Sequence, residues 1–382
     1  MSIPKDFGFG EEEQMLRDAA RKFFQSNMPT ERLHRLVAAN PEPERESQCQ
    51  WDAGLWAQMA ELGWTGVAVP ERAGGLGMPC VAVAALAEEA GRACFPSPLL
   101  PTLHASYVLA ACATPAADAA LADIAAGKSA TLAITNGRGA WNDAAADVEL
   151  RNGRLSGTAP FVQDAAKAGL FVVKARDGEE AGLYLVRAGA SGVQLVADSI
   201  VDLTRDQACV RFDGAAVESV LAPAGAAVAA IRAAEPALFT LLAADMCGAA
   251  EWQLQTTAEY AKVRQQFDRP IGFFQAVKHP LVDFMIALDQ ARSHVYNAAC
   301  LIDHRPEAAL RAAHMAKASA SDMAAFGSSR SVQFHGGIGF TWECYVHLYF
   351  KRQMHNNALF GDPAWHRARL AEMLIGPVGA AA

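Results

Sequence analysis

The spacing of apolar residues changes twice along the chain. Near the start, an acidic segment leads into apolar residues at helical spacing, among them Met15, Leu16 and Phe23, and acidic residues suit the start of a helix. After residue 128 the apolar positions form short runs between turn residues, and after residue 228 long helical periods return. The pattern predicts a helical segment, a β segment and a second helical segment.

The β segment contains six short runs at the spacing of a small sheet sandwich or barrel. They are Thr131–Thr135, Val148–Leu150, Gly169–Ala175, Gly182–Val186, Val193–Val196 and Ala208–Phe212. We therefore predict an α+β protein with an N-terminal helical domain (1–127), a middle β domain (128–225) and a C-terminal helical domain (226–382). The length of 382 residues exceeds what one core usually serves, which also favours several domains.

The composition excludes several classes of protein. A net charge of −8 gives no general basic field for nucleic acid, and the histidines and cysteines show no spacing that fits a metal site. The start of the chain is too polar for a signal peptide. The most apolar stretch, 220–250, is interrupted by Arg232, Glu235 and Asp245, so we expect no membrane span. We expect a cytoplasmic protein with reduced cysteines.

Two stretches of the C-terminal segment are specific enough to indicate a family. Residues 264–275 read Arg-Gln-Gln-Phe-Asp-Arg-Pro-Ile-Gly-Phe-Phe-Gln, and residues 333–339 read Gln-Phe-His-Gly-Gly-Ile-Gly. They resemble the two signatures of the acyl-CoA dehydrogenase family, in the same order and about 60 residues apart. The resemblance extends over nearly the whole chain and implies that family's fold, in which the C-terminal domain is a four-helix bundle.

The resemblance implies FAD as cofactor and an acyl-CoA thioester as substrate. In the family these stretches contact the adenosine diphosphate half of the FAD held by a neighbouring subunit. The residues that would do so here are Arg264, Phe267, Gln275, Gln333, Gly336 and Gly337. Arginine offers a planar cationic fork for phosphate oxygens, and glycine lets the backbone approach a ligand closely. A shared site implies at least a dimer, and we expect a homo- or heterotetramer that passes electrons to an electron-transfer flavoprotein.

The flavin-facing stretches of the middle domain match the family less well. The family loop Thr-Glu-Pro-Gly-x-Gly-Ser-Asp is replaced by Thr135–Gly139, in which the threonine and some glycine remain. The later aromatic-Ile-Thr/Ser stretch reads Phe161-Val-Gln163, so Phe161 could stack on the flavin and Gln163 could donate a hydrogen bond to it. Either the loop has diverged and still binds flavin, or the chain pairs with a different homologous chain and completes only some of the sites.

The dehydrogenation needs a base for the α proton, and the family's usual glutamate is absent. The position nine residues after Arg352 is Gly361, and the family's alternative position on the preceding helix is Leu238. Asp245 lies two helical turns from Leu238 within an apolar stripe. Burial there would raise its pKa toward that of a useful base. We therefore predict Asp245 as the base, with pairing to a buried arginine as the alternative and with Glu235 and Glu251 as rivals.

Three functions remain open from the sequence. The first is α,β-dehydrogenation of an acyl-CoA, by proton abstraction and hydride transfer to flavin N5. The second is a flavin oxidase or monooxygenase on the same fold, which oxygen consumption would reveal. The third is a non-catalytic subunit of a hetero-oligomeric acyl-CoA dehydrogenase. The absence of this glutamate makes the chain similar to the family subgroup that handles bulky acyl groups, including steroid side chains. That resemblance implies a role in lipid metabolism and steroid degradation.

Overall fold

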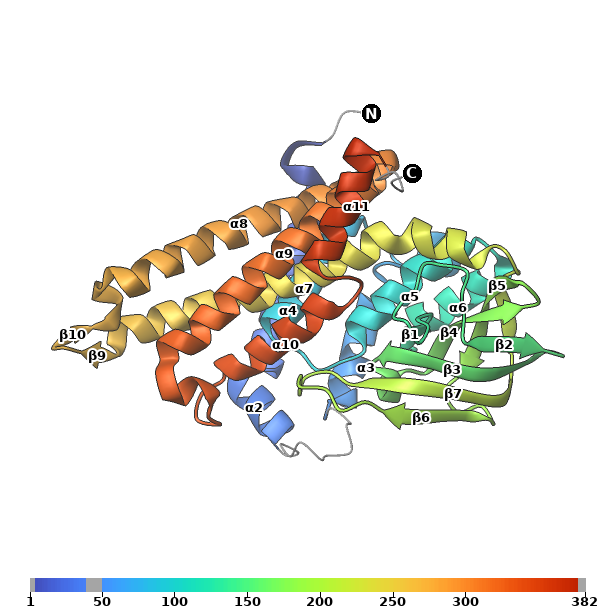
Figure 1. The fold of residues 1–382 in the computed structure, drawn as a ribbon, viewed down its shortest axis with the longest axis horizontal. Helices are drawn as coiled ribbons and strands as arrows, with labels where there is room; N and C mark the ends of the chain where they lie inside the picture. Colours follow the sequence, from blue (N-terminus) through green and yellow to red (C-terminus); the bar gives the residue numbers. More distant parts are fainter. Residues whose placement is uncertain (1–3, 39–49, 377–382) are drawn as a thin grey trace, which may run out of the picture.

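The computed structural model describes residues 4–38 and 50–376. The N-terminal domain consists of helices joined by short 3-10 turns (Figure 1). The helices are α1 (Glu11–Asn27), α2 (Thr30–Ala38), α3 (Ala53–Glu61), α4 (Cys80–Arg92), α5 (Leu99–Cys112) and α6 (Pro115–Ala125), and the turns are η1 (Lys5–Gly8), η2 (Trp64–Gly66) and η3 (Glu71–Ala73). Local signals start two of them: Asp52 caps α3 by accepting from Leu55 N (3.0 Å), and Thr114 caps α6 just before Pro115.

The middle domain is an eight-stranded sheet that encloses a core of its own. The sheet order is β6-β7-β3-β2-β4-β5-β8, with β1 beside β4. The strands are β1 (Ala130–Ala133), β2 (Val148–Arg151), β3 (Arg154–Gln163), β4 (Leu170–Asp177), β5 (Glu180–Arg187), β6 (Val193–Ala197), β7 (Gln207–Ala216) and β8 (Ser219–Ala222), with η4 (Ala165–Lys167) after β3. Successive residues of β4 face opposite sides: Phe171 and Val173 enter the core of the sheet, and Leu170 and Val172 pack with the helices.

The C-terminal domain is built on three long helices, α7 (Ala227–Val263), α8 (Gln275–His304) and α9 (Pro306–His335). The hairpin of β9 (Gln265–Gln266) and β10 (Arg269–Pro270) and the turn η5 (Ile271–Phe273) connect α7 to α8. The turn η6 (Gly336–Phe340), α10 (Val346–Ala358) and α11 (Pro363–Ile375) follow α9. The hairpin projects at one end of the molecule and the β domain forms the opposite end (Figure 1).

Two glycines bring α4 and α7 into backbone contact. A Cβ at Gly91 would lie 2.1 Å from the Asp245 carbonyl oxygen, and a Cβ at Gly248 would lie 1.8 Å from the Glu88 carbonyl oxygen. Only glycine allows so close an approach. The contact ties the N-terminal domain to α7, the central helix of the C-terminal domain.

The predicted order of helical, β and helical domains is confirmed. Strands form at all six predicted runs, and β3 and β8 are two further strands that the pattern did not predict. The helix α7 is long and apolar enough to cross a membrane, but most of its apolar window is buried inside the fold. The cysteines in the described residues are free thiols, and Cys49 lies outside those residues.

Candidate active site

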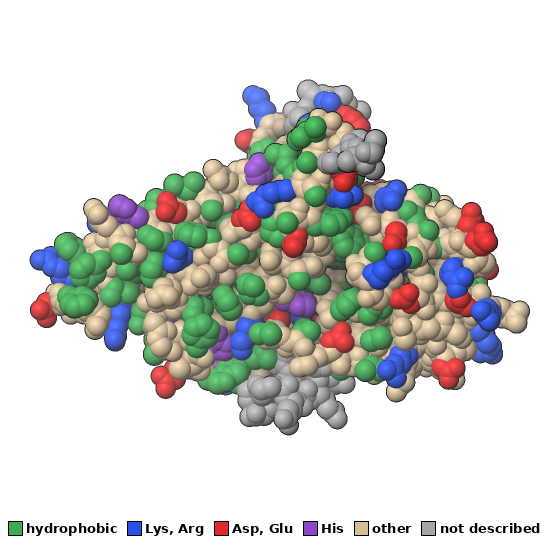
Figure 2. Space-filling model, in the orientation of Figure 1, with side chains coloured by type: hydrophobic (Ala, Val, Ile, Leu, Met, Phe, Trp, Pro, Cys, Tyr) green, Lys and Arg blue, Asp and Glu red, His purple; other side chains and the backbone are tan. Residues whose placement is uncertain are grey.

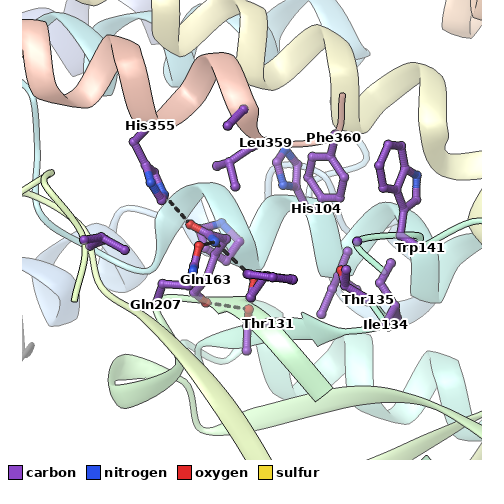
Figure 3. Close-up of a pocket in the computed structure, with 16 residues that line it drawn as sticks. His104, Thr131, Ile134, Thr135, Trp141, Gln163, Gln207, His355, Leu359 and Phe360 are labelled. Carbon is purple, nitrogen blue, oxygen red and sulfur yellow. Dashed lines mark hydrogen bonds between the residues drawn. The ribbon is translucent and has the colours of Figure 1, made fainter. Parts of the chain in front are cut away.

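A cavity of about 390 Å³ lies between the β domain and α10 (Figure 3). Its walls come from α5, from β1 and the loop after it, from β3 and β7, and from the end of α10. The residues that line it are Pro101, His104, Thr131, Leu132, Ile134, Thr135, Gly139, Trp141, Phe161, Gln163, Ile200, Gln207, His355, Ala358, Leu359 and Phe360. The cavity brings the three predicted flavin-facing residues together: Thr135, Phe161 and Gln163.

A β-bulge places Phe161 in the cavity wall. The register between β3 and β7 shifts between Ala159 and Val162, and Phe161 in this bulge has a φ of +60°. A bulge re-aims a side chain, and such a positive φ in a non-glycine residue is costly enough to be worth a functional explanation. Phe161 is 46% exposed, so a planar ligand could stack on its ring.

A chain of hydrogen bonds runs along the cavity floor (Figure 3). Gln207 Nε2 donates to Asp198 Oδ2 (2.8 Å), and Gln163 Nε2 donates to Gln207 Oε1 (2.7 Å) and to the Phe161 carbonyl (3.1 Å). Gln163 Oε1 lies 2.8 Å from His355 Nε2. Both amide hydrogens of Gln163 are therefore engaged within the chain, and the predicted donation from this side chain to a flavin would require one of these bonds to break.

The loop after β1 also uses its donors internally. The Asn136 side-chain oxygen accepts from the backbone nitrogens of Arg138 and Ala140 (3.0 Å each), and Gly139 N donates to the Asn136 carbonyl (2.8 Å). Gly137 N donates to the Asp147 carboxylate (2.5 Å). The loop is a compact turn closed on itself, which offers a ligand the Thr135 side chain but few backbone donors.

Asp245 does not line the cavity; it lies in a buried cluster of charges. Arg352 donates to it twice, from Nη2 to Oδ1 (2.5 Å) and from Nε to Oδ2 (3.1 Å). Arg205 Nη2 donates to Oδ1 (3.1 Å), and Asn356 Nδ2 donates to Oδ2 (2.6 Å). The open space beside this cluster is a void of about 10 Å³, barely enough for one water molecule.

The expected rise in the pKa of Asp245 is wrong. Burial alone would raise it, but the Arg352 and Arg205 guanidinium groups outweigh burial and hold the pKa below its usual range. A carboxylate that keeps its charge among four donors accepts a proton poorly. Asp245 instead pairs with the buried arginines Arg352 and Arg205, which was the alternative considered from the sequence.

The other positions considered for the base are also occupied or closed. Gly361 has a φ of +93°, and a Cβ there would lie 2.5 Å from the Trp365 ring, so a glutamate does not fit. Glu235 Oε1 accepts from Trp141 Nε1 (3.1 Å) and Asn142 Nδ2 (2.6 Å), behind the cavity wall. Glu251 pairs with Arg92 and Arg292. Among the described residues, none that lines the cavity is acidic.

Sequence reasoning missed the two histidines of the cavity. Burial, followed by the charge of Arg205, lowers the pKa of His104 to about 3, and burial lowers the pKa of His355. Both rings are therefore neutral near pH 7. His355 lies one helical turn after Arg352, and that spacing on an apolar-faced helix was the available signal.

The signature residues gather at the opposite end of the molecule from the β domain. The Tyr260 and His335 rings stack at 4.3 Å, and Thr257 Oγ1 lies 2.7 Å from Ser331 Oγ, so the ends of α7 and α9 lie side by side. The hairpin after α7 and the turn η6 after α9 extend from this junction. The structure therefore brings the two signatures together.

This junction is open to solvent. Arg264, Gln275 and Gln333 are exposed, and in the described part of the chain no heavy atom beyond the adjacent residues lies within 4 Å of a Cβ built on Gly336 or Gly337. Phe267 is 85% exposed in a turn where it and Asp268 both have positive φ. Asp268 is exposed, and Arg269 lies over the Phe273 ring (4.5 Å). An exposed cation beside bare backbone suits a phosphate-bearing ligand.

The helical, β and helical arrangement and the exposed junction agree with the flavin-dependent dehydrogenase family that the two signatures resemble. The chain matches the family models of the acyl-CoA dehydrogenase N-terminal domain (residues 10–128) and C-terminal domain (residues 240–375). It is 33% identical over 355 residues to acyl-CoA dehydrogenase IpdE2 of Mycobacterium tuberculosis, covering 92% of this chain and 94% of that protein.

Solved structures agree with the sequence comparison. A variant of the Tcur3481-Tcur3483 steroid ACAD is 30% identical, with a TM-score of 0.83 over 96% of this chain and 98% of that chain. The ChsE4-ChsE5 complex of Mycobacterium tuberculosis is 25% identical, with a TM-score of 0.84 over 98% of this chain and all of that chain. The protein belongs to the acyl-CoA dehydrogenase family, whose members are oxidoreductases that act on acyl-CoA and use FAD.

The described residues fit FAD unequally. The exposed junction offers the cation and the bare backbone that a diphosphate needs. The cavity offers an aromatic ring and a hydroxyl, but the donors of Gln163 and of the loop are already used.

Proposed function

We propose that this chain works in FAD-dependent α,β-dehydrogenation of an acyl-CoA as one subunit of a hetero-oligomer, with the base carried by a different, homologous chain. The observation that carries this proposal is the cavity without an acidic residue, together with Asp245 held by two arginines. An α proton next to a thioester needs a positioned base. Within the described residues of this chain, no carboxylate is placed to take that proton.

The proposal assigns a role to the exposed junction. Arg264 and Gln275 would bind the diphosphate half of a FAD whose ring lies in the partner's pocket, and the Gly336-Gly337 backbone would approach it closely. Phe267 and Gln333 would line the same half. FAD supplies the hydride acceptor, and this chain would bind and orient the cofactor.

Exposed apolar side chains near the junction support a partner chain. They gather around the hairpin, along α8 and on η6 (Figure 2), and comprise Val263, Phe267, Phe273, Val282, Met285, Ile286, Ile338 and Phe340. A cluster of large exposed apolar residues is typical of a protein interface. A dimer of such pairs would form the expected tetramer.

We infer the partner and the substrate from the similar solved structures. The ChsE4-ChsE5 structure is a complex of two chains, and the Tcur3481-Tcur3483 protein is a steroid ACAD. We infer a bulky acyl-CoA of the steroid side-chain type as substrate and an electron-transfer flavoprotein as electron acceptor. We infer that the assembly is cytoplasmic.

Absorption spectra test the proposal. The chain purified alone should show little flavin absorbance, and co-expression with a homologous chain that carries the family glutamate should give a yellow complex bleached by the acyl-CoA. Bleaching of flavin bound to this chain alone would contradict the proposal. Oxygen uptake during turnover of the complex would assign an oxidase instead.

A further inference from the structure

The cavity beside the β domain has no occupant in the proposed function. Its walls include the aromatic rings of Trp141, Phe161 and Phe360, and no Lys, Arg, Asp or Glu of the described residues lines it. A site of about 390 Å³ with such walls suits a small uncharged molecule. Which polar group that molecule carries depends on the hydrogen bonds at the cavity floor.

The hydrogen-bond chain has a fixed direction, because it begins at a carboxylate. Asp198 can only accept, so the Gln207 amide nitrogen faces it and the Gln207 oxygen faces Gln163. The Gln163 nitrogen then donates to Gln207, which leaves the Gln163 oxygen toward His355. His355 Nε2 must therefore carry the hydrogen of this contact.

The consequence is an acceptor at the other ring nitrogen. A neutral imidazole with hydrogen on Nε2 has a lone pair on Nδ1, and burial keeps His355 neutral near pH 7 by lowering its pKa. Within the described residues His355 Nδ1 makes no hydrogen bond, and it is absent from the fully enclosed unpartnered atoms. The ring extends from α10 toward Gln163 (Figure 3).

The cavity is thus complementary to a ligand that donates a hydrogen bond. A flavin ring presents mainly acceptors along its polar edge, but the amide hydrogens of Gln163 and the backbone donors of the turn at 136–140 are already engaged, which leaves the Thr135 hydroxyl as the remaining donor of these stretches. An unpaired donor on a ligand would instead meet His355 Nδ1. A hydroxyl group meets this requirement without adding charge.

We propose that the cavity binds a neutral apolar alcohol or phenol, whose hydroxyl donates to Nδ1 of His355 while its rings or chain pack against Phe161, Trp141 and Phe360. This site lies apart from the flavin junction and involves no redox step. It would recognise a hydroxylated apolar compound, either free or as the end of a larger molecule.

The test compares two probes that differ in one donor. 2-Naphthol and 2-methoxynaphthalene bind by the same rings, but the ether has no hydrogen to give. Titration of the purified protein in its own assembly should show naphthol binding about fivefold to tenfold tighter, the ratio for one net hydrogen bond. His355→Leu should reduce that ratio to about one, and His279→Leu, an exposed histidine outside the cavity, should retain it.

The outcomes separate this site from the proposed function. Equal affinity of the two probes, or a naphthol preference that survives in a folded His355→Leu protein, would overturn the assignment. Competitive displacement of naphthol by riboflavin would give the cavity to the flavin ring and would also overturn it. The assay needs no flavin reduction, so failure of the dehydrogenase proposal leaves its result readable.

Discussion

Asp245→Asn separates a structural carboxylate from a catalytic one. In the wild type, two guanidinium groups and one amide donate to the Asp245 oxygens, and the side chains of Asp245, Arg205 and Arg352 are at most 2% exposed. Asparagine removes the negative charge and turns an NH₂ group toward donors. Arg352 then loses its ion-pair partner, and Arg205 keeps only its longer pair with Asp164 (3.5 Å).

The expected loss is large. Removing one partner of a buried ion pair costs about 3–5 kcal/mol, because the remaining charge stays desolvated. Equilibrium unfolding in urea should show this loss for Asp245→Asn. The matched control is Asp322→Asn, whose exposed pair with Arg367 should contribute less than about 1 kcal/mol.

A catalytic role predicts the opposite combination. If Asp245→Asn unfolds within about 1 kcal/mol of the wild type while the assembly loses flavin reduction by acyl-CoA, the carboxylate is the base and our reasoning is refuted. A destabilised variant whose remaining folded assembly still reduces flavin would agree with the structure.

Three further predictions follow from buried or exposed single groups. Burial lowers the pKa of Lys317 to about 7 from its ordinary 10.5, so between these values the unfolded chain binds more protons than the folded chain. The free energy of unfolding should therefore rise with pH across that window, by up to about 5 kcal/mol. Urea unfolding measured from pH 7 to 10 should show this rise, and Lys317→Met should abolish it. Arg264→Gln should lower the flavin content of the complex at least tenfold, since a charge-assisted hydrogen bond contributes about 1.5–3 kcal/mol. The control Arg367→Gln, at an exposed arginine, should leave the flavin content unchanged. Equal flavin contents in the two variants would show that Arg264 does not bind the flavin dinucleotide. Gly361→Glu should lower the melting temperature without restoring a catalytic base, because residue 361 has a positive φ and its side chain would collide with Trp365. Reduction of flavin by this variant chain alone would contradict the prediction.

The order of the domains could be predicted because the hydrophobic period differs so clearly between helix and strand. Strand β3 was not predicted, since residues 154–160 contain glycine, serine and proline and few β-forming residues. Pairing with β2 and β7 holds this segment extended. Tertiary pairing outweighed local preference there.

The parts of the candidate site that consist of one short stretch of sequence could be predicted. The exposed signatures could be recognised because each is one continuous turn with its own glycines. The environment of Asp245 could not, because its partners Arg205 and Arg352 lie 40 and 107 residues away in the sequence. An apolar stripe indicates that a residue is buried, but it does not reveal which charges are buried with it.

A structure of the FAD-loaded assembly, by crystallography or cryo-electron microscopy, tests the central claim most directly. We predict that the FAD diphosphate contacts Arg264 and the Gly336-Gly337 backbone of this chain, with the flavin ring and a glutamate in the pocket of the partner chain. A FAD bound wholly within this chain, or a diphosphate far from Arg264 in the complete assembly, would contradict the account.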